Sequence, residues 1–508
     1  MNKKQISINM ISGLIAIAVT LAISFLLTPY IVENLGDEAY GYIGLSGNFI
    51  VIASVFTTAL NSMANRFILI AYEKQDEDKV NEYFSSLFVA GIFLAVAFIA
   101  VGLGMSLNIE KIFKITPSLL PAVKLTFIIS ITNFAVITLF TVFSASVFIK
   151  NRLDLTAKAD ITANFFKTVF LILVFSLLSP QIYYVSIGGL IYTAVLYIGH
   201  IINTKRLLPS IKIKMSLAKL KTIKELVFSG AWNSFGSLTQ LLMVGMDLAL
   251  ANWLLDGRAM GLMSIANTIT IASNSVLSIV VGAFTPTLAK TYAKGDLQQL
   301  HRQVSDANRF QAMIMFVPIV GIFTFAPQFY KLWMPYKGSA DILLLSGITF
   351  VKVFDQFAGL TIQAAGNNFY LFNKLRGNAV AKLALSVLNI PIVLILVKIV
   401  GNYNWSIIII SGVSTTLYLI YNWTIAPKLL SKITGQGIKE YYKMILQALK
   451  MFAILLVPFS IISYFAPCNS WISFAVTTGL TGGLGYVMMF LFGLKKDEKA
   501  LVYTKIKK

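Results

Sequence analysis

The sequence has very few of the residues from which disulfide frameworks, metal centres and polar catalytic sites are built. Among its 508 residues there is one cysteine, Cys468, and there are two histidines, His200 and His301, far apart in the chain. A single cysteine excludes an intramolecular disulfide and a thiolate metal cluster. Two distant histidines do not favour a histidine metal site or a catalytic triad, and we expect no cofactor.

Charged residues are also scarce, and hydrophobic residues make up most of the sequence. Only 12% of the residues are charged and 57% are hydrophobic. Apolar runs of about 20 residues or more recur from end to end, each long enough to cross a bilayer core of about 30 Å. The pattern predicts an all-α polytopic membrane protein with about fourteen transmembrane helices. Their expected limits are 10–33, 40–70, 84–107, 121–148, 158–178, 181–203, 226–254, 258–289, 307–333, 339–366, 374–398, 404–426, 443–465 and 470–494.

The charge that remains is strongly basic, with 42 Lys and Arg against 21 Asp and Glu and a net charge of +21. Basic residues gather in the cytoplasmic loops of membrane proteins. A cytoplasmic N-terminus places most of them inside, so we expect both termini in the cytoplasm. The basic excess therefore indicates contact with membrane lipids and no binding of nucleic acid.

A repeat divides the chain. Three short segments recur 220 positions further on, without a gap: LGDEAYG and LDGRAMG, AYEKQD and TYAKGD, and NIEKIF and QFYKLW. Similarity at a fixed offset in an apolar chain predicts two structurally equivalent membrane halves, which is typical of transporters.

The repeat and the charge pattern together predict the domain organisation. Residues 1–203 form an N-terminal six-helix lobe and residues 226–426 a C-terminal six-helix lobe. Between them, residues 204–225 alternate lysines with Leu and Ile, which indicates a basic amphipathic linker on the inner membrane surface. Residues 427–508 have no counterpart in the repeat and form two additional transmembrane helices and a cytoplasmic tail.

The candidate functional residues are the charges at membrane depth. Each costs about 2.5 kcal/mol or more at a helix centre, so each is expected to face a cavity or a partner. They are Arg66, Asp160, Lys167, Asp247, Lys352, Asp355 and Lys382. Lys167, Lys382 and Asp247 have no obvious partner within their own helices, and we favour a functional role for these three. Arg66 lies near a cytoplasmic helix end, where it serves equally well as an inner-leaflet anchor.

Two further alternatives stay open. Lys352 and Asp355 lie three residues apart on one helix, so they are neighbours that can neutralise each other. Asp160 lies near the inner end of its span, where Lys158 or Arg152 can pair with it.

The four buried cations slightly outnumber the buried carboxylates, and a cation-lined cavity favours an anionic cargo. Lys and Arg donors suit phosphate oxygens. A carboxylate such as Asp247 can take up and release H⁺, or bind Na⁺.

The segment LGDEAYG after the first span resembles the loop of polysaccharide flippases, and the segment FTPTLAKTYAKGD at 284–296 resembles their second-half counterpart. These flippases belong to the multidrug/oligosaccharidyl-lipid/polysaccharide exporter superfamily. The resemblance implies an alternating-access transporter without enzymatic activity. Its implied cargo is an undecaprenyl-pyrophosphate-linked oligosaccharide, such as an O-antigen or capsule repeat unit, which crosses the bacterial plasma membrane. Polysaccharide polymerases and glycosyltransferases are the implied protein partners.

The resemblance also implies roles for the buried charges. Arg66, Lys167, Lys352 and Lys382 would attract the pyrophosphate or acidic sugars. Asp247, Asp355 and Asp160 would serve ion coupling or gating.

Other readings compete with this one. A lipid II flippase shares the fold and an anionic lipid cargo, whereas a multidrug and toxin antiporter moves cationic compounds that suit a lysine-rich cavity poorly. A membrane-embedded polymerase or glycosyltransferase needs a large external loop or an acidic cluster, and the external loops here are short. A scaffold that uses the basic inner surface leaves the buried charges unexplained.

Overall fold

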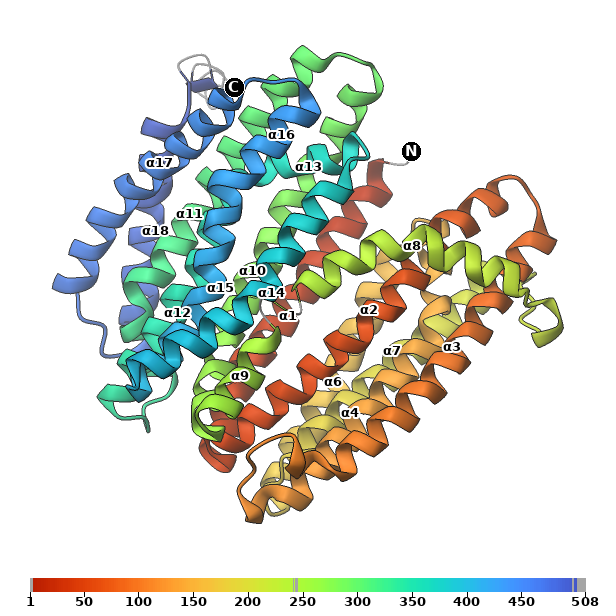
Figure 1. Ribbon diagram of the computed structural model, residues 1–508, viewed down its shortest axis with the longest axis horizontal. Coiled ribbons are helices and arrows are strands. Elements are labelled where there is room, and N and C mark those ends of the chain that lie inside the picture. Colours follow the sequence, from red (N-terminus) through yellow and green to blue (C-terminus); the bar gives the residue numbers. More distant parts are fainter. Residues whose placement is uncertain (1–2, 241, 243–244, 496–497, 500–508) are drawn as a thin grey trace. The chain divides into compact units, whose positions relative to one another are not determined.

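The computed structural model describes residues 3–240, 242, 245–495, 498 and 499, and all regular structure in these ranges is helical (Figure 1). This confirms the all-α prediction. The first part of the chain forms α1 Lys3–Leu35, α2 Asp37–Glu73, α3 Glu77–Leu107, α4 Leu120–Phe140, α5 Ala145–Ile149, α6 Leu153–Leu177, α7 Tyr183–Leu207, α8 Leu220–Gln240, α9 Met246–Leu254 and α10 Gly257–Ala293. The second part forms α11 Leu297–Trp333, α12 Ser339–Leu360, α13 Gln363–Leu371, α14 Leu375–Val400, α15 Tyr403–Ile420, the π-helical turn η6 Tyr421–Ile425, α16 Ala426–Thr434, α17 Ile438–Phe465 and α18 Trp471–Gly493.

Within the described residues, twelve helical segments are long and apolar enough to cross a membrane. They coincide with twelve of the expected spans, so the protein is a multi-pass membrane protein. The other two expected spans, 40–70 and 226–254, fall on α2 and on α8 with α9. A total of fourteen spans stays a prediction.

The chain divides into two compact units, residues 1–265 and 266–508. The division falls inside α10, later than the expected boundary between the lobes. The reason is that α8 packs along α2 and α9 also contacts α2, so both helices belong to the first unit (Figure 1). The predicted limits of the two lobes, 1–203 and 226–426, stay a prediction.

The first unit is held together by helix pairs that bury apolar faces. α6 packs on α1 and α7, and α3 packs on α4. One core cluster joins α2, α3 and α8 through Ile68, Phe84 and Leu226, whose side chains are fully buried. This packing gives α6, which carries two of the candidate charges, a fixed position against its neighbours.

The second unit is built around α11, which contacts α12, α17 and α18. Three phenylalanine rings from three helices meet there. Phe357 lies 5.4 Å from Phe316 and 4.1 Å from Phe452, measured between ring centres. Phe452 is on α17, so the added C-terminal helices contribute to the core of this unit.

The repeat is visible in the local structure of each unit. At the turn from α2 to α3, Asp76 accepts a hydrogen bond from the backbone amide of Lys79 at 2.9 Å. At the turn from α10 to α11, Asp296 accepts one from Gln299 at 2.8 Å. Both aspartates therefore cap the next helix, and the residue before each has positive φ, which explains the glycine at position 295.

Within the first unit, two repeat-equivalent glycines lie against each other. A Cβ atom placed on Gly41 would lie 2.9 Å from the backbone nitrogen of Gly261. A Cβ on Gly261 would lie 2.1 Å from the carbonyl oxygen of Asp37. The first turns of α2 and α10 therefore touch through their backbones, which only glycine permits here.

The two ends of the basic linker belong to α7 and α8, and residues 211–214 between them are non-helical. Ile211 and Ile213 pack against the core of the first unit while Lys212 and Lys214 are exposed, the two-residue alternation of an extended chain. The backbone amides of Lys212 and Lys214 donate to side chains of α3 at 2.8 and 3.2 Å. This segment docks on α3 through its backbone with both lysines outward, and the predicted amphipathic linker on the inner membrane surface stays a prediction.

Candidate functional site

In the second unit, Lys382 lies on a polar face of α14. Asn378, Lys382, Ser386 and Asn389 follow one another at helical spacing, so they share this face, and the last two are fully buried. The amide of Asn389 makes no hydrogen bond within the described residues through either its oxygen or its nitrogen. A buried amide of this kind ordinarily has a polar partner, so this face offers hydrogen bonds to a ligand or to water.

The Lys382 ammonium is held by aromatic rings. It lies 4.9 Å from the ring centre of Tyr421 and 5.8 Å from that of Tyr418, which are distances of cation–π contact. The Tyr421 hydroxyl donates to the side-chain oxygen of Asn378, one turn before Lys382. The two tyrosines are three residues apart at the junction of α15 and η6, so both present their rings to α14.

Asp355 on α12 belongs to the same group. The Thr415 hydroxyl donates to the carbonyl oxygen of Val351 at 3.1 Å, which fixes α15 against α12. One turn after Asp355, Gly359 leaves room for the Tyr418 ring, because a Cβ there would already touch it at 3.4 Å. Asp355 lies within electrostatic reach of both Lys382 and Tyr418. We name this group the Lys382 cluster: Asp355, Lys382, Tyr418 and Tyr421.

Lys352 lies one turn before Asp355 on α12 and is buried, with 6% of its surface exposed. Both residues take part in interactions with other described residues, so neither is an isolated charge. The predicted pairing between them stays a prediction.

In the first unit, α6 carries Asp160 and Lys167. Asp160 accepts a hydrogen bond from the hydroxyl of Tyr192 on α7. Arg152 pairs with Asp154 at 2.9 Å, so in this structure it is not the partner that the sequence offered for Asp160. Between the two charges, Asn164 donates to the hydroxyl of Thr20 on α1 at 3.0 Å.

Lys167 itself is half-buried, two turns beyond Asp160. Its ammonium makes no hydrogen bond and no ion pair with any residue in the described part of the chain. A lysine at membrane depth without a compensating carboxylate costs free energy, so the position is one that a bound anion would stabilise.

The two remaining candidates of the first unit lie apart. Asp247 is buried, with 1% of its surface exposed, in the first turn of α9. Nearby, the Asn48 side chain of α2 donates to the carbonyl oxygen of Gly245 at 2.7 Å. Arg66 is an exposed residue of the same helix α2. Positions 48 and 66 are about 27 Å apart along the helix axis, so the structure does not bring Arg66 to Asp247.

Comparison with known proteins decides the family. The family described as polysaccharide biosynthesis protein matches residues 7–292, more than half of the chain. The chain belongs to this family. A relative of similar length is the uncharacterized membrane protein EpsK of Bacillus subtilis (strain 168), which is 26% identical over 99% of this chain and 98% of EpsK. The resemblance that the loop motifs indicated is thereby confirmed.

Solved structures show the same fold as this polysaccharide biosynthesis protein. A multidrug resistance MATE family transporter of the MOP superfamily matches with a TM-score of 0.69 and 13% identity, over 84% of this chain and 99% of that structure. The structure of the lipid II flippase MurJ matches with a TM-score of 0.62 and 14% identity, over 98% of this chain and 99% of that structure. A MOP superfamily transporter from Pyrococcus furiosus matches with a TM-score of 0.62 and 13% identity, over 86% of this chain and 97% of that structure. At 13–14% identity these matches show a shared fold, which is the fold that the loop motifs indicated.

The sequence reasoning missed the aromatic part of the site in this family member. The candidate residues were the charged residues at membrane depth, and Tyr418 and Tyr421 are uncharged. Their signal was present, since two tyrosines three residues apart share one helix face. It also missed the buried Arg309 of α11, which pairs with Asp306 at 3.1 Å and with Glu498. Glu498 lies 189 positions further along the chain, a distance that no helical pattern predicts.

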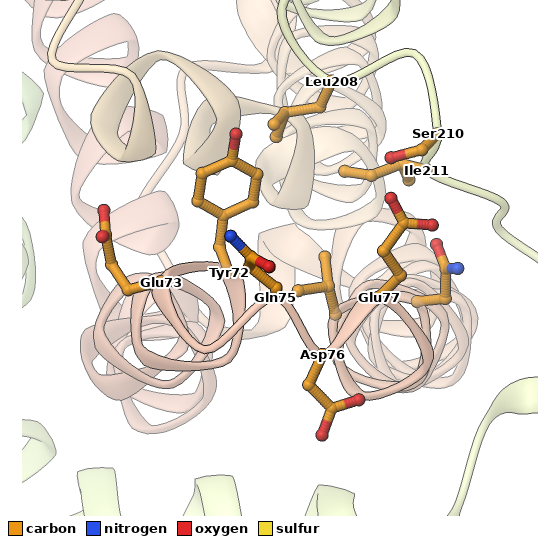
Figure 2. A pocket seen from close by; sticks show the side chains of 10 residues that line it. Tyr72, Glu73, Gln75, Asp76, Glu77, Leu208, Ser210 and Ile211 are labelled. Carbon is orange, nitrogen blue, oxygen red and sulfur yellow. The ribbon is translucent and has the colours of Figure 1, made fainter.

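A cavity of about 470 Å³ in the first unit contains none of the seven candidate residues. It lies between the α2–α3 turn and the segment 208–211 (Figure 2). Tyr72 and Glu77 point toward that segment, whereas Asp76 points away from it and caps α3 (Figure 2). Its carboxylates are exposed to solvent, so their charges are screened and the cavity is not the candidate site.

Proposed function

We propose that the protein flips an undecaprenyl-pyrophosphate-linked oligosaccharide, such as an O-antigen or capsule repeat unit, across a bacterial plasma membrane by alternating access. The observation that carries the proposal is a pair of lysines at membrane depth, Lys167 and Lys382, neither of which forms an ion pair within the described residues. Each unit thus supplies one ammonium with charge available to an anion. The chain's membership of a polysaccharide biosynthesis family supports a cargo that carries a glycan.

The residues divide into two roles. Lys167, Lys352, Lys382 and Arg66 attract the pyrophosphate or acidic sugars, since ammonium and guanidinium donors form charge-assisted hydrogen bonds with phosphate oxygens. Asp247, Asp355 and Asp160 serve coupling to H⁺ or Na⁺, or gating. Asp355 is the coupling candidate of the second unit, since it lies within electrostatic reach of Lys382. Binding H⁺ or Na⁺ at Asp355 would leave that ammonium freer to hold an anion.

The chemistry of the Lys382 cluster supports an anionic cargo with hydroxyl groups. The ammonium faces two rings, and the buried amide of Asn389 has its oxygen and nitrogen available. A phosphate oxygen suits the first group and a sugar hydroxyl suits the second. The proposal also places both termini in the cytoplasm. It includes a polysaccharide polymerase or glycosyltransferases as protein partners.

A second candidate is flipping of lipid II. It is favoured by the MurJ match, which covers 98% of this chain. The MATE structure leaves about 16% unmatched, about the length of residues 427–508. A multidrug antiporter is less well supported for two reasons. The MATE match leaves part of the chain uncovered, and the lysines at membrane depth would repel a cationic cargo.

The test is a flipping assay in proteoliposomes. A fluorescent undecaprenyl-pyrophosphate oligosaccharide is incorporated in both leaflets, and a membrane-impermeant quencher reports how much reaches the outer leaflet. The proposal predicts that the full chain makes nearly all of the fluorescence accessible, and that fluorescent lipid II at the same concentration moves more slowly. Equal transport of lipid II would favour the second candidate, and no transport of either lipid would contradict both.

A further inference from the structure

An apolar pocket in the first unit lies outside the charged site. Its volume is about 460 Å³, and it opens between α2, α3, α4 and the connection from α3 to α4. Five phenylalanines form much of its wall: Phe49, Phe98, Phe113, Phe127 and Phe134. The rings pack edge to face. The ring centres of Phe49 and Phe127 are 5.4 Å apart, and those of Phe98 and Phe134 are 4.9 Å apart. A pocket of this size and composition is in the range of small-molecule sites.

The wall offers no free hydrogen-bonding side chain. Its two hydroxyl groups are already used, because Ser46 donates to the carbonyl oxygen of Ile43 at 2.8 Å and Ser130 bonds with Ser186 at 3.2 Å. A polar ligand would lose its hydrogen bonds to water on entering, and it would find only the remaining acceptor lone pairs of these two hydroxyl groups. The occupant is therefore a hydrocarbon.

The pocket is continuous with the lipid-facing surface. Val101, which lines it, keeps 63% of its surface exposed. α3 and α4 are both long and apolar enough to span a membrane, so the opening lies in the hydrocarbon of the bilayer. A lipid chain can enter sideways without crossing water.

The rim of the pocket is cationic. Ile109, Ile112 and Phe113 close one end, and Lys111 and Lys114 lie in the same segment, whose one carboxylate, Glu110, pairs with Lys124 at 2.9 Å. Both lysines are exposed and donate only to uncharged groups, Asn108 at 2.9 Å and the carbonyl of Leu255 at 3.1 Å. An anionic headgroup attached to a chain in the pocket would meet these two charges.

We propose that this pocket binds the hydrocarbon chain of a polyprenyl phosphate and that Lys111 and Lys114 hold its phosphate. A polyprenyl phosphate carries its single chain directly on the phosphate, so the pocket can take the part of the chain next to the phosphate while Lys111 and Lys114 bind the phosphate itself. The inference rests on the proposed function, since the cargo of that function carries such a chain, and it adds a lipid site in the first unit that is separate from Lys167 and Lys382.

The experiment is photocrosslinking of the full chain in lipid nanodiscs. The probe is undecaprenyl phosphate with a diazirine on its chain, and labelled peptides are mapped by mass spectrometry. Labelling is expected on peptides that contain residues 94–113 and 127–134. Unlabelled undecaprenyl phosphate at about ten times the probe concentration should suppress it by about tenfold, because the two compete for the same pocket. Equal suppression by excess phosphatidylglycerol would overturn the proposal in favour of a general phospholipid cleft.

A matched pair of variants locates the site. Ala97 lines the pocket, whereas Ala100 is on the same helix, is exposed and does not line it. Ala97→Trp should fill the pocket and reduce labelling by about tenfold, while Ala100→Trp should stay within about twofold of wild type. If Ala97→Trp does not fold, the exposed double change Lys111→Gln with Lys114→Gln replaces it and should weaken labelling severalfold. Unchanged labelling in whichever of these variants folds would refute the pocket assignment.

The outcome is separable from that of the proposed function. Labelling does not require flipping, so a chain that is labelled as expected but moves no glycan keeps the tail site and loses the flippase proposal. A chain that moves glycan but is not labelled at the pocket keeps the flippase proposal and loses the tail site.

Discussion

The Lys382 ammonium lies 4.9 Å from the ring centre of Tyr421, whose hydroxyl is hydrogen-bonded one turn away on the same helix as the lysine. A cation held by a ring face rather than by a paired carboxylate retains most of its attraction for a second anion. Cation–π contacts contribute about 0.5–2 kcal/mol, less than a buried ion pair. The tyrosines thus hold the lysine in place and leave its charge available.

The first prediction concerns Lys382. Lys382→Gln should reduce export of surface glycan by about tenfold to a hundredfold, since a hydrogen bond to a charged group contributes about 1.5–3 kcal/mol. Export is measured by glycan staining, and membrane abundance by immunoblot. The control is Lys398→Gln, an exposed lysine of the same helix, which should export normally. Wild-type export by Lys382→Gln at equal abundance would remove Lys382 from the cargo site.

The second prediction concerns Lys167 in the other unit. Lys167→Gln should lower the affinity for the cargo severalfold, because the anion loses an ammonium that has no other partner in the described part of the chain. Binding of undecaprenyl pyrophosphate to the purified protein measures this directly. Lys158→Gln, which removes an exposed lysine of α6, should leave binding unchanged. Equal affinities for the two variants would argue that Lys167 has no contact with the cargo.

Much of the fold follows from the sequence. Apolar runs of about 20 residues fix where helices cross the bilayer, and the repeated aspartates Asp76 and Asp296 mark equivalent helix starts. The candidate site follows only in part. Lys382 and Asp355 were each predicted as site residues because a charge at membrane depth costs free energy. Their association depends on how α12, α14 and α15 pack, and helical spacing in the sequence does not determine that packing.

The third prediction concerns coupling. Asp247→Asn should preserve cargo binding and abolish the stimulation of flipping by an ion gradient, because an amide neither takes up H⁺ nor neutralises Na⁺. Flipping rates in proteoliposomes, with and without imposed H⁺ or Na⁺ gradients, measure the effect. Asp78→Asn, an exposed carboxylate of α3, serves as the control. A gradient response equal to that of wild type would exclude Asp247 from coupling.

The fourth prediction concerns the contact between the first turns of α2 and α10. Gly261→Ala should destabilise the protein by about 1–3 kcal/mol, since the added methyl group has no space beside the backbone of Asp37. Gly282→Ala on the same helix meets nothing within 4 Å and should be neutral or stabilising by about 1 kcal/mol. Thermal unfolding in detergent compares the two. The close approach would be disproved if both variants unfolded at the same temperature.

The fifth prediction is a pH dependence of the C-terminal contact. Partial burial disfavours ionisation of Glu498, but hydrogen bonds from the Arg309 guanidinium and the Lys495 amide outweigh it and hold the pKa of this carboxyl below its usual range. A lowered folded-state pKa means that the stabilisation is complete above the ordinary value of about 4.3 and is lost as the pH falls through the lowered value.

Glu498→Gln measures this contribution. It should lower the melting temperature at pH 7, because Arg309, with 3% of its side chain exposed, loses a charged partner. The difference from wild type should shrink once the pH falls below about 4. A difference that stays constant from neutral to acidic pH would show that the ionised carboxylate is not what stabilises this end of the chain.

The measurement that tests the central claim most directly is the leaflet distribution of lipid-linked glycan in cells that lack the protein. An impermeant enzyme or lectin added outside reports the outer-leaflet pool, and extraction of total lipid reports the whole. The account predicts that deletion strands the lipid-linked glycan in the inner leaflet, and that wild type restores the outer pool while Lys382→Gln restores little of it. A normal outer pool in the deletion strain, with no second flippase present, would contradict the account.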